Sequence, residues 1–278
     1  MRKFYIENEI NERFSLWGNR VYMVDPSGLG IKHDATYIRI GNAFLRNKKM
    51  QVAQSEIGGT IEFLEPGANK KFNEFYNFCA AASSLYLVYD PGDGKEYLRD
   101  IDIAEVSKTE KTGGTLPISV KFKCKSLYYM RNNNSFMFEP ATSEKRYDYR
   151  YDFSYSDYGT YEAQINNNGH VEAPFECTIN GYCANPAIYV IKDGKTIFEV
   201  VFPVAVENGE FIRYSSRDGM LEATLVKEKE EINLMNLLDI ANDNFFKIPI
   251  GNSKIVFSSS SAAANIVTFT IYKMYEVV

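Results

Sequence analysis

Apolar and polar residues alternate along much of the chain, the pattern typical of β-strands with one buried face. In residues 1–65, short runs such as KFYIEN, RFSLWG and YIRIGNAFL are separated by turn residues, including Asp25-Pro26-Ser27-Gly28. QVAQSEIGGTIEFLE follows, with Gly58-Gly59 between two strand-like runs. This region therefore predicts a series of short strands joined by turns.

One segment has the helical period instead. In NKKFNEFYNFCAAAS, residues 69–83, apolar side chains recur three or four positions apart. Pro66-Gly67 precedes the segment, and Asn69 is a candidate N-cap residue. The pattern predicts one α-helix, with an apolar face made of Phe72, Phe75, Tyr76, Cys79 and Ala82.

Strand patterns return directly after this helix. The runs Leu85–Tyr89 and Tyr97–Ile103 flank Pro91-Gly92-Asp93-Gly94, which predicts a β-hairpin. Thr115–Leu127 predicts a further strand, with Ile118, Val120 and Phe122 on one face. The polar run Arg131–Ser135 has no periodicity and predicts an exposed linker. We therefore expect two domains, residues 1–131 and 132–278.

The second half opens on RYDYRYDFSYSDY, residues 146–158, in which aromatic and polar residues alternate. Tyr147, Tyr149, Tyr151, Phe153 and Tyr155 then share one face, as a packed strand or as a sugar-binding platform. A strand facing its own core is the favoured interpretation. Strand-like runs follow, spaced by turns as in a β-sandwich: FECTING, AIYVIKDG, TIFEVVF, EFIRYSS, LEATLV, SKIVFSS and NIVTFTIYKMY.

The amino-acid composition argues against nucleic acid and membrane as partners of this chain. The 278 residues carry a formal net charge of -5, and Lys and Arg are scattered with no basic stripe, which argues against nucleic acid binding. Hydrophobic residues make up 45%, enough for a sizeable core, but no apolar run is long enough for membrane insertion. The N-terminal MRKFYIENEINERF has no apolar stretch typical of an export signal.

The sequence contains few of the motifs that are typical of catalytic sites. His33 and His170 are the only histidines, both in turn-like contexts, and no GxSxG is present. Ser27-Gly28-Leu29-Gly30 lacks the Lys-Ser/Thr of a phosphate loop, and Asp90 and Asp93 lack EF-hand spacing. Many carboxylate pairs exist among 36 acidic residues, but no spacing distinguishes one of them.

The cysteines add no metal motif. None of the four forms a CxxC pair, and we expect reduced, mostly buried thiols at Cys79, Cys124, Cys177 and Cys183. The sequence therefore predicts a protein that is not an enzyme, with no cofactor and no catalytic or metal site. No binding residue is singled out.

An ordered series of landmarks carries a family resemblance. The order NGHVEAP…ING…NP…FFKIPIGNSKIVF, at residues 168–257, resembles the C-terminal domain of the siphophage-type distal tail protein, often called Dit. The Tyr-alternating entry is also typical of that domain. KFYIENEINERFSL, the helix, LYLVYD and ISVKFKCKSLYYM are consistent with its N-terminal half. Leu127-Tyr128-Tyr129 departs from the Pro-Trp-Tyr of many relatives, and the C-terminal half has no large insertion of the carbohydrate-binding kind.

The resemblance implies a mainly β protein: an N-terminal β-sandwich-like domain with one α-helix and a β-hairpin, and a C-terminal galectin-like β-sandwich. It implies a structural hub of a phage tail tip or baseplate, in a phage or a phage-tail-like particle assembled in the bacterial cytoplasm. Six copies would form a ring that joins the tail tube protein to the tail-associated tip protein and can hold receptor-binding proteins.

We expect the N-terminal domain to supply most of the ring contacts, because hairpins, such as Leu85–Ile103, and sheet edges can pair with a neighbour's backbone. The alternative function is a carbohydrate-binding β-sandwich surface protein that uses the tyrosine row. A third, weaker alternative is a glycosidase.

Overall fold

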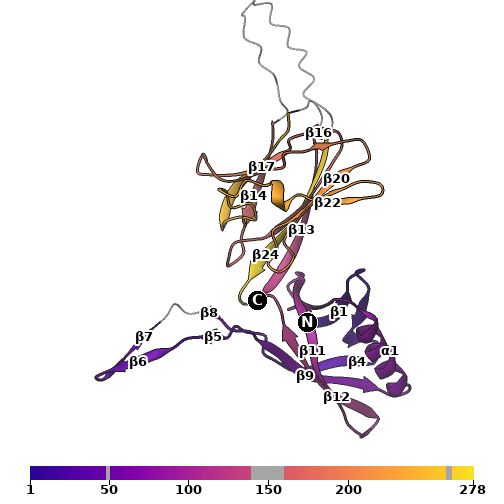
Figure 1. Cartoon of the computed structure of the whole chain (residues 1–278). Coiled ribbons are helices and arrows are strands. Elements are labelled where there is room, and N and C mark those ends of the chain that lie inside the picture. The colour runs from indigo at the N-terminus through magenta and orange to yellow at the C-terminus, as the bar shows by residue number, and fades with distance from the viewer. Residues whose placement is uncertain (48–50, 139–159, 261–264) are drawn as a thin grey trace, which may run out of the picture. The chain divides into compact units, whose positions relative to one another are not determined.

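The computed structural model describes residues 1–47, 51–138, 160–260 and 265–278. Strands dominate these residues, with α1 (Ala68–Ala81) as the α-helix among them, so the predicted mainly β class is confirmed (Figure 1). The chain divides into two compact units. Unit 1 comprises residues 1–130 together with 275–278, and unit 2 comprises residues 131–274.

Unit 1 is built from antiparallel strands in the order β2-β1-β10-β11-β12-β9-β4-β3. Strand β11 changes partner along its length, pairing with β10 through Tyr97–Ile101 and with β12 through Ile101–Lys108. At the other end, Leu16 N donates to Phe4 O and Leu16 O accepts from Met23 N, both at 2.9 Å, which joins β1 to β4. The strands are β1 (Lys3–Asn8), β2 (Arg13–Ser15), β3 (Trp17–Gly18), β4 (Val21–Ser27), β9 (Glu56–Leu64), β10 (Leu85–Asp90), β11 (Tyr97–Lys108) and β12 (Thr115–Cys124).

Alternation along β12 shows why these residues form a strand. Ile118, Val120 and Phe122 are fully buried, whereas Lys121 and Lys123 are exposed. The side chains therefore point alternately into the core and into solvent, as predicted for this segment. The hairpin predicted from Leu85 to Ile103 is confirmed by the antiparallel pairing of β10 with β11.

Helix α1 is confirmed, but its start and its apolar face differ from the prediction. The N-cap residue is Gly67, at φ 94°, and the Glu65 carboxylate accepts from Gly67 N at 2.6 Å. Asn69 lies inside the helix and does not cap it. The preceding carboxylate supplies the acceptor, which is favourable because the N-terminal end of a helix is electropositive. Phe75 and Cys79 are buried, whereas Tyr76 is 52% exposed.

Two turn predictions in unit 1 are wrong. Gly58 and Gly59 lie inside the single strand β9. The run predicted to turn at Asp25 belongs to β4, where the register shifts between Val24 and Ser27 as in a β-bulge. The bulge in β4 and the glycine in β9 are related. A Cβ on Gly59 would lie 2.9 Å from Met23 Cε and 3.2 Å from Val24 O, both on β4. The glycine allows the bulged strand to approach closely.

The prediction of an exposed linker at Arg131–Ser135 is also wrong, because these residues lie within strand β13 (Tyr128–Phe138). Asparagine disfavours strands only weakly, and pairing with neighbouring backbone overrides that preference. That residues 1–131 and 132–278 are two domains that fold independently stays a prediction. Residues 275–278 belong to unit 1, where the Tyr275 ring lies 5.3 Å from that of Tyr97.

Unit 2 contains a sheet in the order β22-β21-β20-β15-β24 and a second in the order β14-β23-β17-β18. Buried side chains from both sheets, such as Phe175, Phe269, Val190 and Phe257, form one apolar core, which is a sandwich arrangement. All seven strand-like runs predicted after residue 174 are strands. The elements are β14 (Thr160–Asn167), β15 (Phe175–Asn180), β16 (Cys183–Ala184), β17 (Ala187–Lys192), β18 (Lys195–Val201), β19 (Ala205–Val206), β20 (Phe211–Ser215), β21 (Glu222–Val226), β22 (Glu231–Asn233), the 3-10 helix η1 (Met235–Leu237), β23 (Gly251–Ser258) and β24 (Asn265–Tyr275).

The tyrosine row from Tyr147 to Tyr155 lies outside the described residues. Neither its packing as a strand nor its use as a sugar platform is tested.

Candidate functional site

A two-stranded ribbon is inserted between β4 and β9, and we call residues 32–53 the arm (Figure 1). Its pairs are β5 (His33–Asp34) with β8 (Gln51–Val52) and β6 (Tyr37–Ile40) with β7 (Ala43–Arg46). Backbone bonds from Ala53 N to Lys32 O and from Asn47 N to Thr36 O, both 2.8 Å, extend this pairing. Gly41-Asn42 forms the two-residue turn at its tip, with Gly41 at φ 61°.

The arm exposes an unusual amount of apolar surface. Every residue of β6 and β7 is exposed, and Phe44 and Ile40 are 69% and 60% accessible. The register places Ile38 opposite Leu45 and Ile40 opposite Ala43, so these four aliphatic side chains share one face. The other face carries Tyr37, Arg39, Phe44 and Arg46.

The arm also differs in charge from the rest of the chain. Residues 28–53 contain five basic residues and one acidic residue, a net charge of +4, whereas the whole chain carries -5. The other 252 residues therefore carry -9, the difference between these two values. A basic, apolar ribbon thus extends from an acidic protein.

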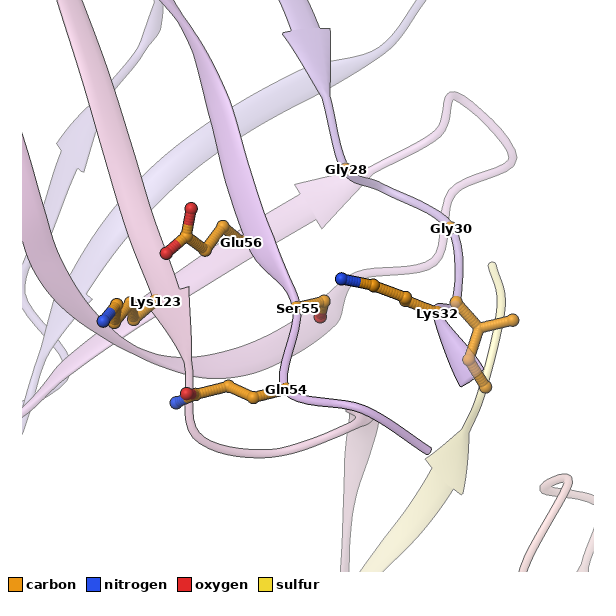
Figure 2. A pocket seen from close by; sticks show the side chains of 8 residues that line it. Gly28, Gly30, Lys32, Gln54, Ser55, Glu56 and Lys123 are labelled. Atoms are coloured by element: carbon orange, nitrogen blue, oxygen red, sulfur yellow. The ribbon is translucent and has the colours of Figure 1, made fainter. Parts of the chain in front are cut away.

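The root of the arm is a tight crossing of its two ends. Gly28 has φ 77°, and a Cβ there would lie 1.9 Å from Glu56 O, so only glycine fits. Next to this crossing is a polar pocket of about 500 Å³, shown in Figure 2. Its lining consists of Gly28, Gly30, Ile31, Lys32, Gln54, Ser55, Glu56 and Lys123.

Gly28→Ala is expected to lower the free energy of unfolding of unit 1 by about 2–4 kcal/mol, since it adds both a clash and left-handed strain. Gly30→Ala is the matched control, because a Cβ at Gly30 meets nothing within 4 Å and φ is not positive. Urea unfolding monitored by circular dichroism measures both. Equal stability of the two variants would contradict the tight crossing.

Arg99, on β11, lies directly behind the pocket wall. Its side chain is buried, and Nη2 donates to Ser55 Oγ at 2.5 Å while Nε donates to Ser126 O at 2.8 Å. The guanidinium lies 4.7 Å from the centre of the Tyr128 ring. Among the described residues, no carboxylate forms an ion pair with Arg99, and Nη1 has no hydrogen-bond partner.

The two histidines considered for catalysis belong to different units. His33 lies on the arm in unit 1, and His170 lies in unit 2. Asp90 and Asp93 accept hydrogen bonds from Gly92 N and Lys95 N, at 2.7 and 3.0 Å, as expected of a hairpin turn. Within the residues that the structure describes, no group of three or more His, Cys, Asp or Glu side chains could hold a metal ion.

The prediction of buried thiols is confirmed, since all four cysteines are free and buried. Burial raises the pKa of Cys79 to about 12 and that of Cys183 to about 11, so these thiols are poor nucleophiles. In the described part of the chain, no helix combines the length and apolar character needed to cross a membrane.

The hairpin Leu85–Ile103, one candidate for an assembly edge, has its strands paired within the chain. Strand β10 pairs with β1 on one side and β11 on the other, and β11 also pairs with β12. The exposed hairpin is instead YIRIGNAFLR in the arm, which the alternation suggested was one strand. The signal was its central Gly-Asn, a dipeptide suited to a two-residue turn.

Comparison with known proteins identifies the N-terminal domain and the fold. Residues 3–125 match the family model described as the distal tail protein, N-terminal domain. The full chain is similar in fold to a chain of the phage P2 baseplate in its activated conformation with calcium, at 18% identity, a TM-score of 0.70 and 100% coverage of both chains. It is also similar to the SPP1 Dit protein, at 10% identity and a TM-score of 0.58, covering 96% of this chain and 98% of that one. No curated protein sequence matched.

The chain is thus a two-unit β protein whose residues 3–125 match the N-terminal domain of the distal tail protein. Over its whole length the chain has the fold of the P2 baseplate chain and of the SPP1 Dit protein.

Proposed function

We propose that six copies of this chain form a ring at the tip of a phage tail, and that the arm of each copy binds the next copy. The observation that carries the proposal is the arm, whose apolar side chains are exposed on both faces. Large exposed apolar surface marks interaction sites in proteins. An arm that binds a different surface on its neighbour makes a head-to-tail contact, the kind that closes into a ring.

Charge supports a second copy as the partner. The region containing the arm is net +4 and the remainder of the chain is net -9, so the arm of one copy is attracted to the body of another. The arm is also long enough for this contact. From Lys32 to the tip at Ile40, nine residues of strand span about 30 Å.

The ring would join the tail tube protein to the tail-associated tip protein and would hold receptor-binding proteins outside. This part of the proposal is supported by the match of residues 3–125 to the distal tail protein domain and by the two similar folds. Of these, one is described as part of a baseplate and the other as a hub of an adsorption apparatus in phages that infect Gram-positive bacteria. The ring would therefore be located at the tail tip of the virion, after assembly in the host cytoplasm.

The test compares the wild-type chain with the double variant Ile40→Asp and Leu45→Asp, alone and mixed with tail tube and tip proteins. Both positions are exposed on the aliphatic face, so melting should be unchanged. Native mass measurement should show six copies of the 31.7 kDa chain for the wild type and a monomer for the variant. Negative-stain images should show a ring only for the wild type.

Ile10→Asp provides the matched control, because Ile10 is 65% exposed in unit 1 but lies outside the arm. This variant should still assemble. A wild-type chain that remains a two-fold dimer in every mixture would contradict the ring. A ring that survives both arm substitutions would contradict the role of the arm.

A further inference from the structure

The pocket at the root of the arm is separate from the exposed apolar strands β6 and β7 on which the ring proposal rests. Three segments line it: the end of β4 leading into the arm, the end of the arm leading into β9, and β12. Figure 2 shows the Lys32 side chain reaching toward Ser55. Lys32 and Lys123 bring two positive charges to the lining, and Glu56 brings one negative charge.

A third positive charge lies behind the wall. Arg99 is 4% exposed and hydrogen-bonds to Ser55, which is itself a lining residue. A buried cation without a carboxylate partner is costly, and among the described residues the hydrogen bonds and the Tyr128 ring offset that cost. Its field therefore adds to those of the two lysines at the pocket.

We propose that this pocket binds a carboxylate, supplied by an acidic side chain of a second copy of the chain. Two lysines and one glutamate line the pocket, Arg99 is bonded to the lining residue Ser55, and both lysine amines can donate to carboxylate oxygens. The pocket lies where the arm leaves the body, so the copy that receives the arm is also close to it. That copy carries the acidic body, net -9 outside residues 28–53.

This inference rests on the proposed ring, and cross-linking tests it directly. Rings would be assembled from equal amounts of ¹⁴N and ¹⁵N chains and treated with a water-soluble carbodiimide. The reagent joins a lysine amine to a carboxylate as an amide and takes up the water as a urea. Mass spectrometry should find Lys32 or Lys123 peptides of one isotope joined to acidic peptides of the other.

Charge reversal gives a second readout. Lys32→Glu with Lys123→Glu should weaken association about tenfold or more, with melting unchanged because both side chains are exposed. The control pairs Lys95→Glu with Lys195→Glu, two exposed lysines that do not line the pocket. This control matches the change in charge and should leave association within about twofold of wild type.

The outcomes separate the two proposals. Rings whose cross-links at these lysines join only peptides of the same isotope, such as Lys123 to Glu56, would overturn the carboxylate site and leave the ring intact. Absence of any ring would overturn both. Saturable binding of inorganic phosphate by calorimetry, lost in the double variant and without mixed-isotope links, would assign the pocket to a free anion and overturn the second copy as its source.

Discussion

Phe75→Ala is expected to lower the free energy of unfolding of unit 1 by about 3–5 kcal/mol, as for other fully buried aromatic residues. The ring of Phe75 is fully buried on α1, 5.5 Å from the ring of Phe14 and 6.1 Å from that of Phe63. Its removal leaves a cavity between the helix and the strands that it covers. Urea unfolding monitored by far-UV circular dichroism measures the loss.

Tyr76→Ala is the matched control for this prediction. Tyr76 is adjacent on the same helix but 52% exposed, so its truncation should change stability by less than about 1 kcal/mol. Equal losses of stability in the two variants would contradict the orientation of α1, in which Phe75 faces the strands and Tyr76 faces solvent.

Tyr214→Ala is expected to destabilise unit 2 by about 3–5 kcal/mol. The Tyr214 ring is fully buried and lies 5.2 Å from Phe175 and 5.8 Å from Phe202. Its hydroxyl donates to Asn244 O at 2.8 Å, which ties the long loop before β23 to the core. If the two units unfold separately, Phe75→Ala and Tyr214→Ala should shift different transitions in calorimetry.

Tyr214→Phe isolates the hydroxyl, because it keeps the ring and removes only the donor. It should cost about 1–2 kcal/mol at neutral pH. Burial raises the pKa of Tyr214 above its ordinary value of 10, so the folded state keeps this proton at a pH where the unfolded chain loses it. The stability that the neutral hydroxyl contributes is therefore present below pH 10 and lost as the pH rises above it. Tyr214→Phe should lose less stability than wild type between pH 9 and about 11, and an equal loss would contradict this account.

The candidate assembly surface was only partly predictable. Alternation in YIRIGNAFL identified residues with strand character, and the ordered landmarks resembled the distal tail protein family. Neither revealed that both faces of this hairpin are exposed, because an exposed apolar strand and a buried one have the same pattern. The pocket at the root depends on Gly28, Ser55, Arg99 and Lys123, which are distant in sequence, so no local pattern predicts it.

Local periodicity by itself determined the mainly β class, the single predicted helix, the buried face of β12 and the seven later strands. These follow from which side chains can share a face over a few residues. Only the tertiary structure decided that Arg131–Ser135 belongs to a strand, that Gly58-Gly59 continues one, and that the hairpin at Leu85 is interior while the arm is exposed. The physical reason is that strand pairing and burial are set by backbone partners far along the chain, which outweigh the weak preferences of individual residues.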